Sequence, residues 1–74
     1  MTVDEQTDLA SRLTSPERQA LELIAEGNST RDSARLMQVA LEDAAVTEAK
    51  AMQKIGATTR AEAVRFALTA LREV

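Results

Sequence analysis

Apolar side chains recur at helical spacing in three segments of this 74-residue chain. Positions three or four apart share one face of an α-helix, so each stripe predicts a helix that packs through that face. The stripes are Ala20, Leu21, Ile24 and Ala25; Leu41, Ala44, Ala45, Ala51, Met52 and Ile55; and Val64, Ala67, Leu68 and Leu71, with Phe66 and Ala70 flanking the last. No segment shows the alternation typical of a strand. The pattern predicts an all-α fold with helices over residues 15–26, 41–54 and 60–72.

The expected helix starts carry polar residues three positions apart. Thr14 stands three residues before Glu17, and Pro16 lies between them in the expected first turn. In such a capping box, each side chain accepts a hydrogen bond from a backbone N–H that the helix leaves unpaired. The same spacing recurs in two further pairs, Ser29 with Asp32 and Thr59 with Glu62. Helices should therefore begin near residues 15, 30 and 60.

Two glycines mark the expected helix ends. Gly27 and Gly56 follow apolar stripes, and glycine readily adopts the left-handed conformation that closes a helix. Residues 1–12 form either a short amphipathic helix through Val3 and Leu9 or an N-terminal arm. Residues 13–72 are then expected to make one domain, a bundle of four or five helices.

The composition narrows the classes of function. The chain has no cysteine and no histidine, so it lacks the commonest metal ligands and the commonest general base. We therefore expect no enzyme activity, no metal and no cofactor. The start, Met1-Thr-Val-Asp-Glu-Gln, is polar and acidic, unlike a signal peptide, and no apolar run is long enough to span a membrane. A cytoplasmic protein without membrane contact is expected.

The net charge is −3, whereas proteins that bind nucleic acid are usually basic. The acidic residues are concentrated in the first third of the chain: Asp4, Glu5, Asp8, Glu17, Glu22 and Glu26. The total charge therefore does not exclude a basic patch elsewhere.

The ends of residues 13–68 resemble the DNA-binding domain of LuxR-type (GerE-like) transcription regulators. The matching positions are Leu13-Thr14, Glu17-Arg18, Leu21, Leu23 to Gly27, Ser29, Ala34, Lys54, Gly56 and Arg60 to Val64. The resemblance implies a four-helix bundle in which the second and third helices form a helix-turn-helix. It also implies that the third helix enters the major groove of DNA and that the fourth often packs in a dimer.

The expected recognition helix departs from that family. Where the family usually has a phosphate-binding threonine, a core valine and a base-reading lysine, this chain has Asp43, Ala44 and Ala45. Where the family has a histidine and a core aliphatic residue, it has Thr47 and Glu48. Glu42 and Asp43 would face phosphates if this end of the helix entered a groove, and both would repel them. We therefore expect weak DNA binding.

The residues left for DNA binding are Arg31, Arg35, Thr47, Lys50, Lys54 and Arg60. These cations could equally be ordinary surface charge. Glu48 is expected on the surface or in an ion pair with Lys50, Lys54 or Arg35.

The corner of the helix-turn-helix is weakly encoded. The family usually has glycine at the position of Gln38 and Ser or Thr at the position of Ala40. Each replacement costs about 1 kcal/mol, through left-handed strain at Gln38 and a lost cap at Ala40. No glycine or proline lies between Thr30 and Ile55, so one long helix over residues 30–55 competes with the turn.

The sequence favours a small, stand-alone LuxR-type regulator with weak or altered DNA binding. One alternative is a protein-interaction module that antagonises another regulator; a second is a small helical adaptor with one long central helix. The last helix offers an apolar stripe for a homodimer or for a heterodimer with a related regulator: Val64, Ala67, Leu68 and Leu71.

Overall fold

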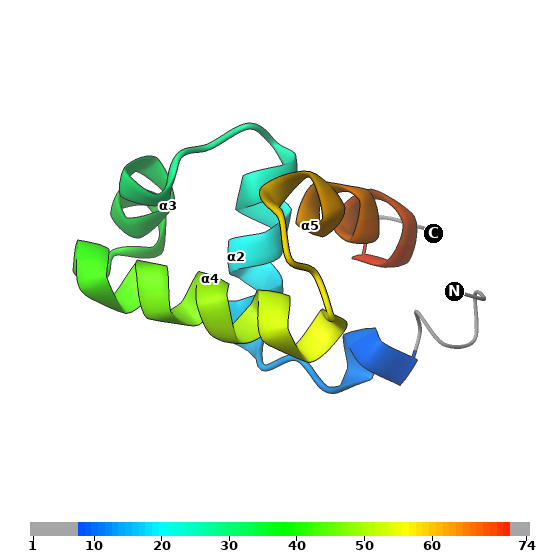
Figure 1. Cartoon of the computed structure of the whole chain (residues 1–74). Helices are drawn as coiled ribbons and strands as arrows, with labels where there is room; N and C mark the ends of the chain where they lie inside the picture. The colour runs from blue at the N-terminus through cyan, green and yellow to red at the C-terminus, as the bar shows by residue number, and fades with distance from the viewer. Residues whose placement is uncertain (1–7, 72–74) are drawn as a thin grey trace.

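The computed structural model describes residues 8–71, and within them the chain is helical, without strands. Its elements are α2 (Ser15–Ala25), α3 (Thr30–Met37), α4 (Leu41–Ile55), α5 (Arg60–Phe66) and the π-helix η1 (Ala67–Leu71). Residues 8–11 form a further helical turn, and residues 1–7 of the expected arm or short helix lie outside the described residues. Figure 1 shows α2 running through the middle, with α3 and the start of α4 at one end of the molecule and α5 at the other. The predicted all-α fold is confirmed.

The core lies where α2 meets α4, α5 and η1. It consists of Ala10, Leu21, Ile24, Ala51, Ile55, Ala63, Phe66 and Ala67. Half of these residues are alanines, which let the helices approach closely but bury little apolar area each. Phe66 therefore supplies the largest single apolar side chain of this core.

The face that α5 buries differs from the predicted one. Ala63, Phe66 and Ala67 are buried, whereas Val64 is half-buried and Leu68 is 48% exposed. Both sets have helical spacing, so periodicity alone could not choose between them. The prediction that Phe66 flanks the packed face was wrong, because α5 turns this large ring toward α2.

Two of the three predicted capping boxes are complete. Thr14 with Glu17 and Thr59 with Glu62 make both reciprocal hydrogen bonds. At α3 only the first half forms: the Asp32 N–H donates to Ser29 Oγ over 3.1 Å. The Asp32 carboxylate instead lies 4.0 Å from Arg35, because aspartate is one methylene shorter than glutamate. The helices begin at residues 15, 30 and 60, as predicted.

Three helices end in the same way, each with one residue in the left-handed conformation. These residues are Gly27 (φ 94°), Gln38 (φ 61°) and Gly56 (φ 73°). After each, a backbone N–H reaches back five residues: Asn28 to Leu23, Val39 to Ala34 and Ala57 to Met52, over 2.9 to 3.1 Å. This is the Schellman pattern of helix termination. The alternative of one long helix over residues 30–55 is therefore wrong, and α3 and α4 form a helix-turn-helix with its corner at Gln38.

Candidate nucleic-acid interface

The second helix of the helix-turn-helix, α4, begins without a side-chain cap. Ala40 has the extended conformation of an N-cap residue (φ −66°, ψ 152°) but carries no side-chain acceptor. Glu42 and Asp43 occupy the first turn, where negative charge favours the helix dipole. Both side chains are exposed. The end of α4 that would approach DNA therefore presents two carboxylates.

Glu48 holds α4 against α3 and α5 from inside the protein. It is only 5% exposed. Its Oε1 accepts hydrogen bonds from Thr30 Oγ1 at 2.8 Å and from Arg60 Nη1 at 3.3 Å, whereas its Oε2 has no partner among the described residues. The expectation that Glu48 lies on the surface or pairs with Lys50, Lys54 or Arg35 was wrong. Position 48 still faces inward, as it does where the family has an aliphatic core residue, and the Glu48 carboxylate is therefore buried.

Arg60, which was predicted to contact DNA, makes two internal contacts at this buried site. Besides the ion pair with Glu48, its Nη2 donates a hydrogen bond to the Asn28 carbonyl over 2.8 Å. The Arg60 side chain is 45% exposed. A phosphate that approached Arg60 would therefore share the guanidinium with these two internal partners.

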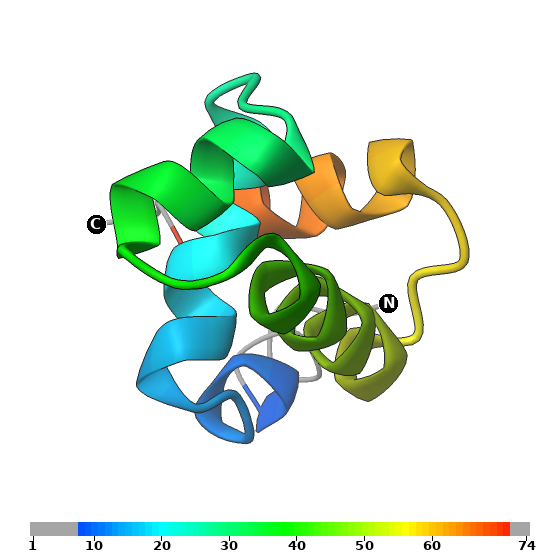
Figure 2. The ribbon, with the colours of Figure 1, turned by 90° about the vertical axis from the view of Figure 1, so that its left-hand side faces the viewer.

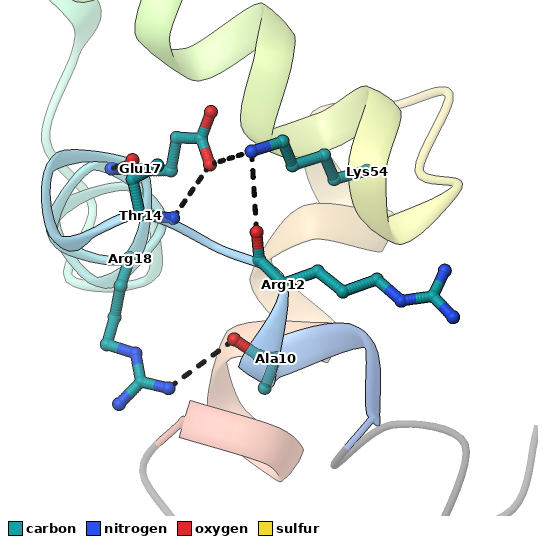
Figure 3. Close-up of polar contacts among 6 residues, drawn as sticks. All are labelled: Ala10, Arg12, Thr14, Glu17, Arg18 and Lys54. Carbon is teal, nitrogen blue, oxygen red and sulfur yellow. Dashed lines mark hydrogen bonds and ion pairs between the residues drawn. The ribbon is translucent and has the colours of Figure 1, made fainter.

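Lys54 is also held internally. Figure 3 shows its ammonium group pointing toward Glu17 and the chain before α2. The Lys54 Nζ lies 2.8 Å from Glu17 Oε1 and donates a second hydrogen bond to the Arg12 carbonyl at 3.4 Å. The hydrogen bond from Lys54, followed by that from the Thr14 N–H, lowers the pKa of Glu17. This predicted DNA contact therefore joins the end of α4 to the start of α2.

Three predicted cations remain accessible: Arg31, Arg35 and Lys50. In residues 8–71, Arg31 and Lys50 make no ion pair, and Arg35 makes only the loose contact with Asp32. Thr47 is half-buried on α4. The structure thus separates the six predicted residues into three open cations, two tethered cations and one partly covered hydroxyl.

Four large apolar residues around the corner are exposed, and the sequence did not predict this. Leu36 is 58% exposed, Val39 40%, Leu41 41% and Val46 51%. Leu41 and Ala45 were predicted to face the core, but both are exposed. Helical periodicity gives no signal for Leu41 or Ala45, because both lie on the stripe predicted for this helix, whereas Val46 lies off that stripe.

Three further features of residues 8–71 bear on other kinds of site. A shallow hollow of about 490 Å³ near the end of α4 is lined by Ala49, Met52, Gln53, Gly56, Ala57 and Thr58, none of them a titratable acid or base. Residues 8–71 contain no group of His, Cys, Asp and Glu side chains that could hold a metal ion. None of the described helices has the length and apolar character needed to cross a membrane.

Comparison with known families agrees with the helix-turn-helix geometry. The family model for bacterial regulatory proteins of the luxR family (GerE) matches residues 11–67. No curated protein and no solved structure matches the chain. The matched segment runs from the turn before α2 to the start of η1, and so includes the corner and all of α4.

Proposed function

Because the chain belongs to the LuxR family of bacterial regulatory proteins, we propose that it is a cytoplasmic transcription regulator whose DNA binding is weak and mostly non-specific. Family membership supports DNA binding as the general function, in a family of regulatory domains rather than enzymes. The observation that carries the finer proposal is the charge at α4. Glu42 and Asp43 are exposed at its first turn, while Lys54 is held in an ion pair with Glu17.

The open cations set the expected strength of DNA binding. Arg31, Arg35 and Lys50 can make at most about three phosphate contacts, and each contact contributes about 0.9 to the salt slope on duplex DNA. We expect the logarithm of the binding constant to fall with the logarithm of salt concentration with a slope of about −2 to −3. Fluorescence anisotropy with a labelled duplex at several salt concentrations measures this slope.

Two variants test whether α4 faces the DNA. Lys50→Gln should lower the slope by about 1, because it removes one phosphate contact. Arg65→Gln is the matched control: Arg65 is an exposed cation on α5, outside the helix-turn-helix, and its loss should leave the slope unchanged. Equal effects of the two variants would contradict binding through α4.

Removal of the carboxylates should strengthen binding. Glu42→Gln and Asp43→Thr each remove one negative charge from the start of α4, and Asp43→Thr also restores the hydroxyl that the family usually carries there. Gln19→Lys makes the same change in net charge on an exposed position of α2 and should have less effect. Nanomolar, sequence-selective binding by the wild-type protein at physiological salt would disprove the weak-binding proposal.

A second candidate function, modulation of another regulator by protein contact, rests on Leu68. This residue is 48% exposed on η1, beside the half-buried Val64 and Leu71. Ala67, the fourth residue of the predicted interface, is completely buried in the chain's own core and offers no surface. Any interface here must therefore centre on Leu68.

Sedimentation tests this second function. Leu68→Glu and Leu71→Glu, made separately, should weaken self-association or binding to a related regulator, because a buried charge at an interface is costly. Ala61→Glu, at an exposed position of α5, is the control for added charge, and circular dichroism checks that each variant folds. A monomeric wild type at high concentration, with folded variants that bind every candidate regulator normally, would rule this interface out.

A further inference from the structure

Exposed apolar residues gather at one end of the molecule. Of the five large hydrophobic residues that are most exposed in the described chain, four lie between positions 36 and 46: Leu36, Val39, Leu41 and Val46. We call these four residues the corner surface. They follow the end of α3, the turn and the first half of α4, the end of the molecule that faces the viewer in Figure 2. Single exposed apolar residues are common, but a group of them indicates an interaction site.

The corner surface is separate from the hydrophobic core. None of its residues belongs to the core cluster or to the partly buried residues packed against it. Their apolar area is therefore free to contribute to binding when a partner covers it, at roughly 25 cal/mol per Å² removed from water.

The charge around the corner surface selects the kind of partner. Glu42 and Asp43 lie between Leu41 and Val46 in the chain, are exposed, and have no ion pair among residues 8–71. Polyanions such as DNA and anionic membranes are repelled by these carboxylates and offer little to the leucines. A second copy of the chain, docked corner to corner, would add two more carboxylates to the same contact, because a two-fold interface uses the same patch of both subunits.

We propose that the corner surface binds a cationic amphipathic helix of a partner protein. The apolar face of such a helix would cover Leu36, Val39, Leu41 and Val46, and its lysines or arginines would pair with Glu42 and Asp43. Binding of an amphipathic helix through a few apolar anchors, with charges at the rim that set specificity, is a common mode of recognition. Because the site overlaps the start of α4, the partner and DNA would exclude each other.

The test uses the whole chain and a synthetic peptide. A leucine–lysine peptide of about 15 residues, long enough to form a helix and with its leucines on one face, is titrated into the labelled protein while amide NMR signals are followed. We expect shifts concentrated in residues 36–46. A peptide of the same composition in scrambled order, and a leucine–glutamate peptide with the helical pattern, should bind at least about tenfold more weakly.

Variants locate the site. Leu41→Ser and Val46→Ser should each weaken peptide binding by roughly five- to tenfold, and Glu42→Gln should reduce both affinity and its salt dependence. Ala61→Ser is the control, since Ala61 is exposed on α5, outside both the corner surface and the Leu68 surface, and its replacement should leave peptide binding unchanged. The proposal is overturned if the scrambled peptide binds equally well, if the shifts fall outside residues 36–46, or if Ala61→Ser weakens binding as much as Val46→Ser does.

Discussion

Gln38 shows how much a single residue can cost without changing the fold. It is the only residue other than glycine with positive φ in the described chain, at φ 61° and ψ 44°. An L-residue in this region is strained by contact of its Cβ with the neighbouring carbonyl. The hydrogen bonds from the Gln38 and Val39 N–H groups to α3, at 3.2 and 3.0 Å, and the packing of α3 on α4 hold the turn in place.

Gln38→Gly should stabilise the protein by roughly 0.5 to 1 kcal/mol, because glycine occupies the left-handed region without strain. The gain is the strain relieved minus the extra flexibility that glycine gives the unfolded chain. Urea denaturation followed by circular dichroism measures the change in the free energy of unfolding.

Gln19→Gly is the matched control for this change. Gln19 is exposed in the interior of α2, where glycine costs about 1 kcal/mol relative to a good helix former. The two variants remove the same side chain and should change stability in opposite directions. A loss of stability in Gln38→Gly similar to that in Gln19→Gly would contradict the strained turn.

At the scale of the element, α4 is held by its neighbours more than by its own first turn. Its N-cap position is Ala40, and no side chain caps its first N–H groups. Its inner face carries Glu48, a charged residue among alanines. A missing cap and a buried charge therefore oppose this arrangement, and contacts with α2, α3 and α5 compensate for them.

Ala40→Ser should stabilise α4 by about 1 kcal/mol, because the extended backbone at Ala40 already suits a serine that accepts a hydrogen bond from the first turn. Thermal unfolding should show a higher Tm. Ala45→Ser, at an exposed position one turn into the helix, should lower stability slightly, since serine is a poorer helix former than alanine. A lower Tm for Ala40→Ser would count against the missing cap.

The Glu48–Arg60 pair should respond asymmetrically to mutation. Arg60→Met leaves a buried carboxylate without its cation and should destabilise the protein by roughly 1 to 3 kcal/mol. This is less than the cost of breaking a fully buried ion pair, because the Arg60 side chain is partly exposed. Glu48→Leu should be neutral or stabilising, because it removes the buried charge and fills the space with apolar atoms while Arg60 can turn to solvent.

Chemical denaturation at neutral pH measures both effects. Arg35→Met is the control for loss of an exposed ion pair: the contact of Arg35 with Asp32 is 4.0 Å long and solvent-exposed, so its removal should cost less than about 0.5 kcal/mol. If Glu48→Leu were as destabilising as Arg60→Met, the pair would be a net source of stability and our interpretation would be wrong.

At the scale of the whole molecule, the Glu17–Lys54 ion pair joins residues 37 positions apart. It ties the start of α2 to the last turn of α4, while Lys54 also reaches the Arg12 carbonyl before α2 (Figure 3). Glu17 simultaneously completes the capping box with Thr14. One carboxylate therefore supports a helix start and a tertiary contact.

This arrangement predicts a dependence of stability on pH. The pKa of Glu17 is lowered in the folded protein, chiefly by the hydrogen bond from Lys54, from an ordinary value of 4.5. Its contribution to stability is therefore fully present above about pH 4.5 and is lost as the pH falls through the lowered folded pKa. Urea midpoints measured from about pH 7 down to about pH 3 should decrease over this acidic range.

Glu17→Gln identifies the group responsible. It should cost about 1 to 2 kcal/mol at neutral pH, through the lost charge-assisted hydrogen bonds, and should flatten the acidic part of the profile. Some dependence should remain, because hydrogen bonds from Thr58 also lower the pKa of Glu62. An acidic profile identical in wild type and Glu17→Gln would exclude Glu17 as its source.

The sequence by itself determined where α2, α3 and α5 begin and where two helices end. Thr14, Thr59, Gly27 and Gly56 act through hydrogen bonds to backbone groups only a few residues away, so the signal and its effect lie in the same short segment. The exposed charges of the candidate site, including Glu42 and Asp43 on α4, could also be predicted. The charge of an exposed side chain does not depend on how distant residues pack.

Only the tertiary structure decided what depends on distant partners. The turn at Gln38 prevails over a continuous helix because α3 and α4 must both pack on α2, although local preference opposes the turn. Glu48 could not be placed inside from its residue type, since burial requires the cation of Arg60, twelve positions away. The tertiary structure also decided that Leu36, Leu41 and Val46 are exposed, because it fixed which side of each helix packs on the core. Periodicity shows that a helix has an apolar face, but not which neighbour will cover it.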